Sequence, residues 1–234
     1  MYLTRFRFNA ARTGARRLLT SPQMLHAAVM SAFPEAPAVP DGGPRVLWRV
    51  DHNSPAQILL YITSPARPDL THLVEQAGWP AAAPQGWETY DYGTFLAGLS
   101  AGSTWAFRLT ANPVHSIRRK EGEPTKRTAH RTAHHQIQWL LKQQEKRGFV
   151  VVEKPAERRR LERGDEYELV VGGTKGLAFT KSGDRRGRPV TISTVTYQGR
   201  LRVTDADVFR RTLAAGLGKA KAYGCGLLTL APVT

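Results

Sequence analysis

The chain has 234 residues, with 34 Lys and Arg against 19 Asp and Glu, and its formal net charge is +15. One cysteine excludes an internal disulfide framework and a cysteine-based zinc site, and no apolar run approaches the 18 residues of a membrane-spanning helix. The strong positive charge favours a polyanionic partner, either nucleic acid or an anionic membrane surface.

Length and composition allow one large or two small domains with folded cores, since 41% of the residues are hydrophobic. The N-terminal stretch lacks the uninterrupted apolar core of a signal peptide, so we expect a cytoplasmic protein.

The positive charge is unevenly distributed along the chain. Residues 1–19 carry five Arg and no acid, residues 20–107 have a net charge of −4, and residues 108–234 have a net charge of +14. Runs of one sign, such as Arg158–Arg160, favour a polyanion-binding surface. A surface charged only for solubility usually interleaves both signs.

The first half of the chain predicts a mixed pattern of strands and helices. Tyr2–Phe8 alternates as a half-buried strand does, and Ser21 before Pro22 is typical of a helix N-cap, with Pro34 closing that helix. The remaining expected elements are strands at Val46–Val50 and Gln57–Thr63 around a turn at Asp51–Ala56, a helix from Asp69 to about Gly78, and a loop or irregular segment over 78–93.

The same order then repeats in the second half. The expected elements are a strand at Thr104–Ala111, a basic loop over 113–128, a helix over about 130–147, strands at Phe149–Glu153, Tyr167–Val171, Gly176–Lys181 and Pro189–Thr204, a helix from its cap Asp205 to Ala215, and a strand at Leu227–Leu230. Both halves follow the order β-α-β-β-α-β. The sequence therefore predicts an α+β protein of two tandem ferredoxin-like (RRM-like) domains, 1–98 and 99–234. This fold has many functions and decides none.

A glycine-rich segment, 216–226, lies between the last predicted helix and strand. Its glycines and lysines predict a backbone that approaches phosphate oxygens closely; they are Gly216, Gly218, Lys219, Lys221, Gly224 and Gly226. The spacing of a Walker loop is absent, and a dinucleotide fingerprint would follow a strand. The alternative is a glycine-rich connection packed on the sheet, in which Cys225 fits by its small size rather than by thiol chemistry.

Two further segments predict contacts with a phosphate backbone. One is a hairpin over 179–188 with a cationic tip, and the other is the loop over 118–127. The RNA-binding candidates on or near them are Arg118, Arg119, Lys126, Arg127, Lys175, Arg185, Arg186 and Arg188. The alternative for each segment is an exposed charged turn.

Histidines occur at two places that could carry chemistry. His26 lies on the first predicted helix, on the same face as Gln23, and a lone helical histidine is more often a surface residue. His130 and His134 have a spacing that can bind a metal. Neighbouring arginines would repel a cation and no carboxylate completes the set, so we expect a solvated basic face and no metal site.

Four segments, in this order, resemble the CasE family, the CRISPR repeat endoribonuclease of the type I-E Cascade complex. They are MYLTRFRFN, SPQMLH with His26, FRLTANP at 107–113, and GRLRVTDADVFRRTLAAGLGKAKAYGCGLLTLAP at 199–231. The resemblance covers nearly the whole chain. The glycine-rich motif is shared with the wider group of repeat-processing ribonucleases, whereas the segments at 46–49 and 111–113 favour CasE.

The resemblance implies two tandem ferredoxin-like domains and cleavage of CRISPR precursor RNA at the 3′ base of the repeat stem-loop, without metal or cofactor. It also implies that His26 is catalytic and that the enzyme stays on its product with the other Cascade subunits. Some members carry Tyr three residues before the histidine. Here Gln23 occupies that position, and an amide donates a hydrogen bond but is neither acid nor base near neutral pH.

RNA supplies its own nucleophile, the 2′-hydroxyl, so one histidine and cationic side chains suffice for cleavage. We expect a 2′,3′-cyclic phosphate and a 5′-hydroxyl, with His26 as general acid or base. Lys181, or alternatively Lys175, would neutralise the phosphate. The competing hypothesis is a non-catalytic RNA-binding subunit of the same fold. A membrane-surface protein is disfavoured, because a domain core explains the apolar face of the Gln136–Arg147 helix.

Overall fold

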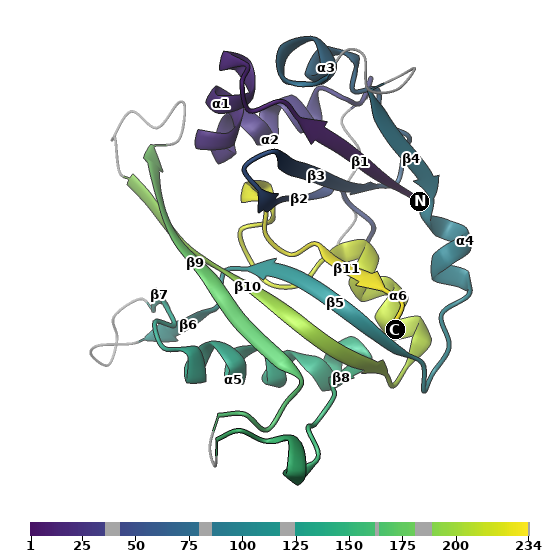
Figure 1. Cartoon of the computed structure of the whole chain (residues 1–234), viewed down its shortest axis with the longest axis vertical. Coiled ribbons are helices and arrows are strands. Elements are labelled where there is room, and N and C mark those ends of the chain that lie inside the picture. Colours follow the sequence, from purple (N-terminus) through teal and green to yellow (C-terminus); the bar gives the residue numbers. More distant parts are fainter. Residues whose placement is uncertain (36–42, 80–85, 118–124, 162–163, 181–188, 234) are drawn as a thin grey trace. The chain divides into compact units, whose positions relative to one another are not determined.

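The structure is a computed structural model that describes residues 1–35, 43–79, 86–117, 125–161, 164–180 and 189–233 (Figure 1). Contacts group the chain into two compact units. The first unit contains Met1–Leu99, Arg210–Leu217 and Lys221–Leu227, and the second contains Ser100–Phe209, Gly218–Ala220 and Leu228–Thr234. The predicted domains 1–98 and 99–234 stay a prediction.

The first unit is built on a four-stranded antiparallel sheet in the order β2-β3-β1-β4. This is the strand order of a ferredoxin-like domain, with the first and third strands in the centre. Its elements are β1 (Tyr2–Phe8), α1 (Thr13–Thr20), α2 (Pro22–Met30), β2 (Leu47–Ser54), β3 (Gln57–Ser64), α3 (Thr71–Ala77), β4 (Trp87–Asp91) and α4 (Tyr92–Ala97).

Local sequence signals explain β1 and α2. Phe6 and Phe8 of β1 are buried between exposed arginines, as the alternation predicts. Ser21 accepts a hydrogen bond at its Oγ from the backbone N–H of Met24, 3.3 Å away, which confirms the predicted N-cap with Pro22 at the first helical position. The helix buries Leu25 and Val29 in the core.

Two expectations for this unit were wrong, and one helix was not predicted. The segment expected as a loop over 78–93 contains β4. This strand forms by pairing with the distant β1, and its short polar sequence does not predict that pairing. The expected turn at Asp51–Ala56 belongs mostly to β2, which continues to Ser54 because its pairing with β3 continues to Gln57. Helix α1 was not expected, since it buries only Ala15 and Leu18.

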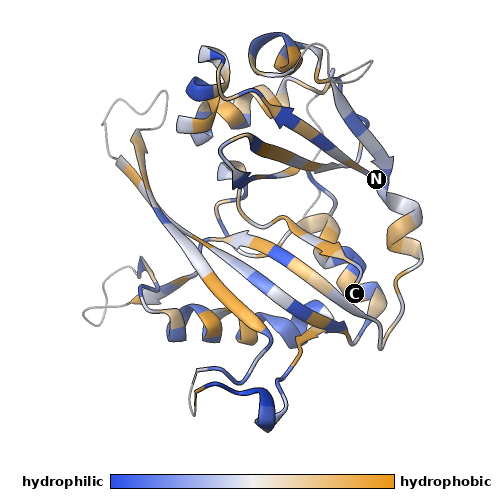
Figure 2. Ribbon diagram, in the orientation of Figure 1, coloured by the Kyte–Doolittle hydropathy of each residue, from blue (hydrophilic) through white to orange (hydrophobic). Residues whose placement is uncertain are grey.

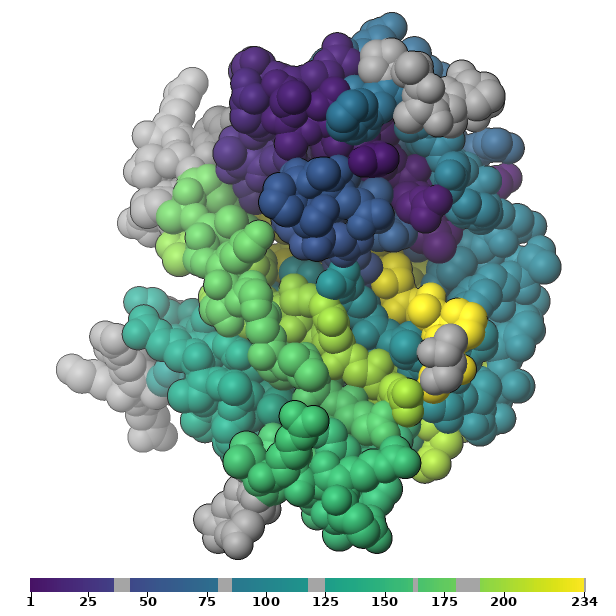
Figure 3. Space-filling model, viewed as in Figure 1, coloured from purple at the N-terminus to yellow at the C-terminus, as the bar shows by residue number. Residues whose placement is uncertain are grey.

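The second unit repeats the same sheet order with different strands. The order β11-β5-β10-β8 again places the first and third strands of the repeat in the centre, and this confirms the predicted fold of two tandem ferredoxin-like domains. Its elements are β5 (Thr104–Ala111), β6 (Val114–Ile117), β7 (Lys126–Ala129), α5 (Ala133–Gln144), β8 (Phe149–Val151), β9 (Leu169–Thr180), β10 (Pro189–Val203), α6 (Ala206–Ala215, shared with the first unit) and β11 (Leu228–Ala231). Figure 3 shows β11 (yellow) beside β5 (teal) at the surface.

Helix α5 covers one face of this sheet. The Tyr197 hydroxyl of β10 donates a hydrogen bond to the Gln136 carbonyl at 3.0 Å, and the Trp139 ring stacks on the Tyr197 ring with centroids 6.0 Å apart. Because side chains alternate along a strand, Gln198 and Arg200 project from the opposite face. That face carries the polar residues of the second sheet.

Two expectations for the second unit were also wrong in detail. Tyr167–Val171 and Gly176–Lys181 were expected as separate strands, but β9 is continuous, because it pairs with β10 along its length with one irregularity at Thr194/Thr196. The basic loop over 113–128 contains the hairpin strands β6 and β7. The cap Asp205 is confirmed, since its Oδ1 accepts from the Val208 N–H at 2.9 Å. Over the described ranges, no helix has the length and apolar content needed to cross a membrane.

Candidate functional site

Three consecutive residues of β2 contact the two parts of the glycine-rich segment that belong to the first unit, or the residue that follows it. A Cβ atom on Gly216 would lie 2.7 Å from Leu47 Cδ2, and one on Gly224 would lie 2.8 Å from Trp48 Cζ3. The next residue, Arg49, donates from Nη1 to the Leu227 carbonyl at 3.0 Å. The segment therefore follows the side chains of β2 closely.

The glycines of this segment are needed by packing and by backbone conformation. Gly216 and Gly224 have φ values of +75° and +78°, in the left-handed region that glycine favours, and both are buried. This supports packing on the sheet as the reason for these two residues. Lys219 is exposed and Lys221 is half-buried, so the predicted phosphate contact rests on the lysines. Burial raises the pKa of the Cys225 thiol to about 12, consistent with a packing role.

Arg49 and Asp51 form a buried ion pair beside this segment. Their side chains are 2% and 7% exposed, and Nε–Oδ1 and Nη2–Oδ2 are 2.7 and 2.9 Å apart. The Arg49 guanidinium also lies over the Tyr61 ring, 5.6 Å from its centroid. Such a two-point ion pair fixes the orientation of both side chains. It anchors β2 where the strand meets Leu227.

His26 lies on α2 and is half-buried. Its Nδ1 accepts a hydrogen bond from the indole N–H of Trp48, 3.3 Å away, and Trp48 is only 3% exposed. Burial lowers the pKa of His26 below the ordinary value of 6.5. Burial therefore favours the neutral form of the ring. Sequence reasoning missed Trp48, because an apolar residue in a predicted strand is normally part of the core.

A short 3-10 helix, η3 (Lys221–Tyr223), packs against both α2 and β2. Lys221 therefore lies on an element that packs against the helix carrying Gln23 and His26. These residues are far apart in sequence, and the first unit assembles them around one helix. The first unit thus supplies an imidazole, an amide and an ammonium group. These are side-chain groups that can transfer protons and stabilise charge at a phosphate.

The other predicted binding residues divide into two groups. Lys126 and Arg127 on β7 and Lys175 on β9 are exposed in the second unit. The predictions for Lys181, Arg118, Arg119, Arg185, Arg186 and Arg188 lie outside the described residues.

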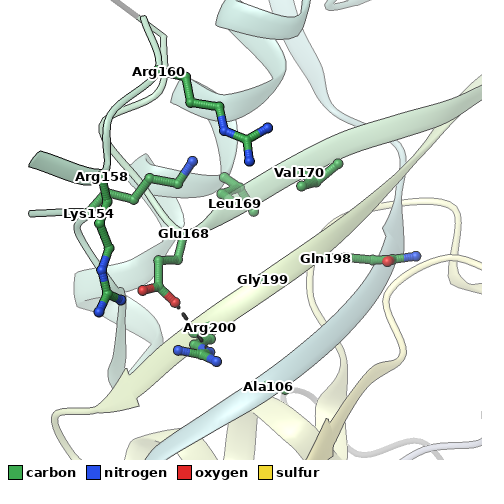
Figure 4. A pocket seen from close by; sticks show the side chains of 10 residues that line it. All are labelled: Ala106, Lys154, Arg158, Arg160, Glu168, Leu169, Val170, Gln198, Gly199 and Arg200. Atoms are coloured by element: carbon green, nitrogen blue, oxygen red, sulfur yellow. Dashed lines mark ion pairs between the residues drawn. The ribbon is translucent and has the colours of Figure 1, made fainter. Parts of the chain in front are cut away.

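The second unit contains a cationic pocket of about 680 Å³ (Figure 4). Its lining includes four cationic side chains, Lys154, Arg158, Arg160 and Arg200. Arg200 forms an ion pair with Glu168 at 3.3 Å, and Figure 4 shows these two side chains pointing toward one another. The sequence shows the arginine run. The sequence alone does not show that the connection between β8 and β9 places these arginines at the edge of the sheet.

Apolar surface adjoins these cations. Figure 2 shows the start of β9 as an apolar stretch, and Val170 within it is 69% exposed. Leu169 and Val170 both line the pocket. The pocket thus combines positive charge with an apolar floor, which suits a nucleotide better than a simple anion.

Histidines cluster beside the β6–β7 hairpin. The rings of His115 and His130 stack with centroids 4.4 Å apart, and those of His130 and His135 lie 5.8 Å apart. Burial, followed by the charges of His115, His135 and Lys142, lowers the pKa of His130. Among the residues that the structure describes, no three His, Cys, Asp or Glu side chains are arranged to hold a metal ion.

Comparison with known proteins gives one family match and two curated relatives, one of them over nearly the whole chain. Residues 1–232 match a family model described as CRISPR associated protein. The CRISPR-associated endoribonuclease Cse3 of Thermus thermophilus is 30% identical over 236 residues, which cover 99% of this chain and 100% of the relative. The Cascade subunit CasE of Escherichia coli K12 is 44% identical over 52 residues, covering 22% of this chain and 25% of the relative.

Solved structures agree with these sequence matches. Cse3 bound to a 19-nucleotide RNA has a TM-score of 0.73 at 26% identity and covers 99% of this chain and 100% of that chain. Thermus thermophilus Cse3 bound to an RNA representing a pre-cleavage complex has a TM-score of 0.73 at 28% identity, over 99% and 98% of the two chains. Cas6e of Escherichia coli, at 22% identity and a TM-score of 0.60, supports the fold.

Proposed function

The chain belongs to the CRISPR-associated protein family, and on that premise we propose that it is an endoribonuclease of the CasE type. It binds the CRISPR repeat stem-loop and cleaves precursor CRISPR RNA at the 3′ base of the stem. It then remains bound as a subunit of Cascade in the cytoplasm. Full-length similarity to Cse3 and to its RNA-bound structures supports the activity. The single observation that carries the mechanism is the half-buried His26 on α2, the helix against which the lysine-bearing η3 packs.

Cleavage of RNA by its own 2′-hydroxyl needs three things from the protein. The 2′-oxygen must be held in line with the 5′-oxygen that leaves, protons must move, and the negative charge on the phosphorus centre must be stabilised. We propose that His26 acts at the scissile phosphate, either as general acid or base or through its ring N–H as a hydrogen-bond donor to the developing charge. The products are a 2′,3′-cyclic phosphate and a 5′-hydroxyl, and no step requires a metal ion.

Cationic and amide side chains stabilise the phosphate. Gln23 lies one helical turn before His26, where its amide can donate to a phosphate oxygen. Lys221 lies on the element that packs against α2 and supplies positive charge there. Lys181, with Lys175 as the alternative, remains our proposal for the lysine nearest the scissile phosphate.

The second unit holds the RNA stem. By sequence it carries 23 basic and 12 acidic residues, a net charge of +11, whereas the first unit carries 11 and 7, a net charge of +4. Exposed Lys126, Arg127 and the pocket cations contact phosphates, because a side chain cannot read bases in the narrow major groove of A-form RNA. Binding by phosphate contacts predicts an affinity that falls steeply with salt.

A second candidate function is a non-catalytic RNA-binding subunit of the same fold, favoured by Gln23 at the position where some family members carry Tyr. One experiment separates the two functions. Repeat RNA is incubated with the protein in EDTA, and the ends of the products are identified for wild type and for His26→Ala. Cyclic phosphate ends from wild type alone support the proposal. Intact, bound RNA with wild type would establish the binding subunit instead.

A further inference from the structure

We propose that Trp48 is a positioning residue for His26: its indole N–H holds the imidazole in the tautomer that carries its proton on Nε2. The proposal rests on the proposed function, since it concerns how the proposed catalytic histidine is prepared for its task. It assigns a role to a buried tryptophan that neither the sequence pattern nor the family resemblance assigns.

The chemistry of the two rings determines the tautomer. An indole N–H can only donate a hydrogen bond, so the atom that faces it must carry a lone pair. In this structure that atom is Nδ1 of His26, 3.3 Å from Trp48 Nε1. A neutral imidazole with a lone pair on Nδ1 carries its hydrogen on Nε2. The Trp48 contact therefore selects one of the two neutral tautomers.

Trp48 is held on several sides, so it can act as a fixed reference for the histidine. It is 3% exposed in the core of the first unit, and its backbone pairs with Ile62 of β3. Gly224 packs so closely on its six-membered ring that an added Cβ would lie 2.8–3.2 Å from three ring atoms. The glycine-rich segment thus limits the positions that the indole can take, and the indole in turn orients His26.

The same contact disfavours the protonated ring. An imidazolium carries hydrogens on both nitrogens, so after protonation the Nδ1–H and the indole N–H would point at each other. The buried indole N–H of Trp48 would then have lost its acceptor. This acts in the same direction as burial, which lowers the pKa of His26. Removing only the indole N–H should therefore raise the pKa of His26.

The selected tautomer has a consequence for cleavage. With its hydrogen on Nε2, the neutral ring donates a hydrogen bond from Nε2 to an oxygen of the scissile phosphate, where negative charge develops. Proton abstraction by Nε2 would need the other tautomer, which forfeits the Trp48 hydrogen bond. Trp48 therefore favours charge stabilisation by Nε2–H at the start of the reaction.

Nitrogen NMR of protein labelled with ¹⁵N in its histidine rings tests the proposal directly. The signals of His26, one of seven histidines, are identified by their loss in His26→Ala. Wild type should show an unprotonated Nδ1 and a protonated Nε2. Trp48→Phe should show a mixture of tautomers and a higher His26 pKa. Its single-turnover cleavage at saturating RNA should slow by about tenfold, with unchanged RNA affinity.

Trp105→Phe is the matched control. Trp105 donates from Nε1 to Ser103 Oγ at 3.1 Å in the second unit, so the control deletes an indole hydrogen bond in which His26 takes no part. It should change neither the His26 signals nor the cleavage rate. If Trp48→Phe does not fold, benzothienylalanine at position 48 replaces N–H by sulfur and keeps the shape of the ring.

The outcomes separate this inference from the proposed function. A wild-type His26 with its hydrogen on Nδ1, or a His26 pKa that is equal in wild type and the position-48 variants, overturns the role of Trp48. Wild-type cleavage by Trp48→Phe also overturns it, provided that His26→Ala is inactive. Wild-type cleavage by His26→Ala overturns the proposed catalytic assignment instead, even where the NMR shows the tautomer set by Trp48.

Discussion

The two units use their positive charge in different ways. In the first unit, buried or half-buried arginines hold the protein together. Arg49 is paired with Asp51, Arg12 donates to the carbonyls of helix α3, and Arg210 donates to the carbonyl oxygens of Leu96 and Leu99. In the second unit, Arg158 and Arg160 of the pocket and the cations of β7 are exposed, whereas Lys154 and Arg200 are paired with Asp165 and Glu168. The buried scaffold arginines thus lie in the unit that carries His26, and the exposed cations that we propose for binding an anionic ligand lie in the other unit.

The lowered pKa of His26 is not a consequence of the chain's positive charge. Cations near an imidazole lower its pKa, but exposed cations are screened by water and salt. Burial is the cause of the lowered His26 pKa. The scaffold can therefore be altered separately from RNA binding, and the changes below test that separation.

The largest effect should come from the buried ion pair. Arg49→Met leaves the Asp51 carboxylate buried without its partner, and we expect the free energy of unfolding to fall by about 4 kcal/mol. Chemical denaturation measures this. The double variant Arg49→Met with Asp51→Leu should recover most of the loss, because it removes both charges. Equal stability of Arg49→Met and wild type would show that the pair does not anchor β2.

The next effect concerns RNA affinity. Replacing Arg158 and Arg160 together by Ala should weaken binding to repeat RNA by about tenfold and reduce the slope of log affinity against log salt by roughly 1.5. Cleavage at saturating RNA should be unchanged. The matched control replaces exposed Arg16 and Arg17 of the first unit, removing the same charge. Equal losses in the two variants would contradict a division between the units.

Gly224→Ala tests the close packing on Trp48. A Cβ there is strained at φ +78° and meets the indole, so we expect a loss of about 3 kcal/mol in stability and slower cleavage. Gly102→Ala isolates the strain, because Gly102 has φ +84° and nothing within 4 Å of an added Cβ. It should cost about 1 kcal/mol. Identical costs would show that the contact with Trp48 is unimportant.

The smallest effect is the pH dependence of stability. A lowered pKa means that unfolded His26 binds a proton more readily than folded His26, so its contribution is present above pH 6.5 and is lost as pH falls through the folded pKa. Wild type should therefore lose more unfolding free energy than His26→Ala between pH 7 and pH 5. Parallel curves would show that burial does not affect this histidine.

Short-range signals made much of the fold predictable. The alternation in Tyr2–Phe8, the cap at Ser21 and the strand Thr104–Ala111 depend on neighbouring residues and were confirmed. β4 and the continuous β9 depend on pairing with distant strands, and sequence reasoning missed them.

The candidate site was only partly predictable for the same reason. His26 was identified through a motif. Its hydrogen-bond partner Trp48 lies 22 residues away on another element, and only the folded sheet brings the two together. The glycine-rich segment was found as a pattern, but its packing on β2 follows from contacts between residues more than 150 positions apart.

The most direct test of the account is single-turnover cleavage of saturating repeat RNA in EDTA by His26→Ala, beside His52→Ala, which removes an exposed histidine of the same unit. We predict that His26→Ala is slower than wild type by about a thousandfold with RNA affinity within about twofold, and that His52→Ala matches wild type. Wild-type cleavage by His26→Ala, or a loss of binding in parallel with cleavage, would contradict the division between a catalytic first unit and an RNA-binding second unit.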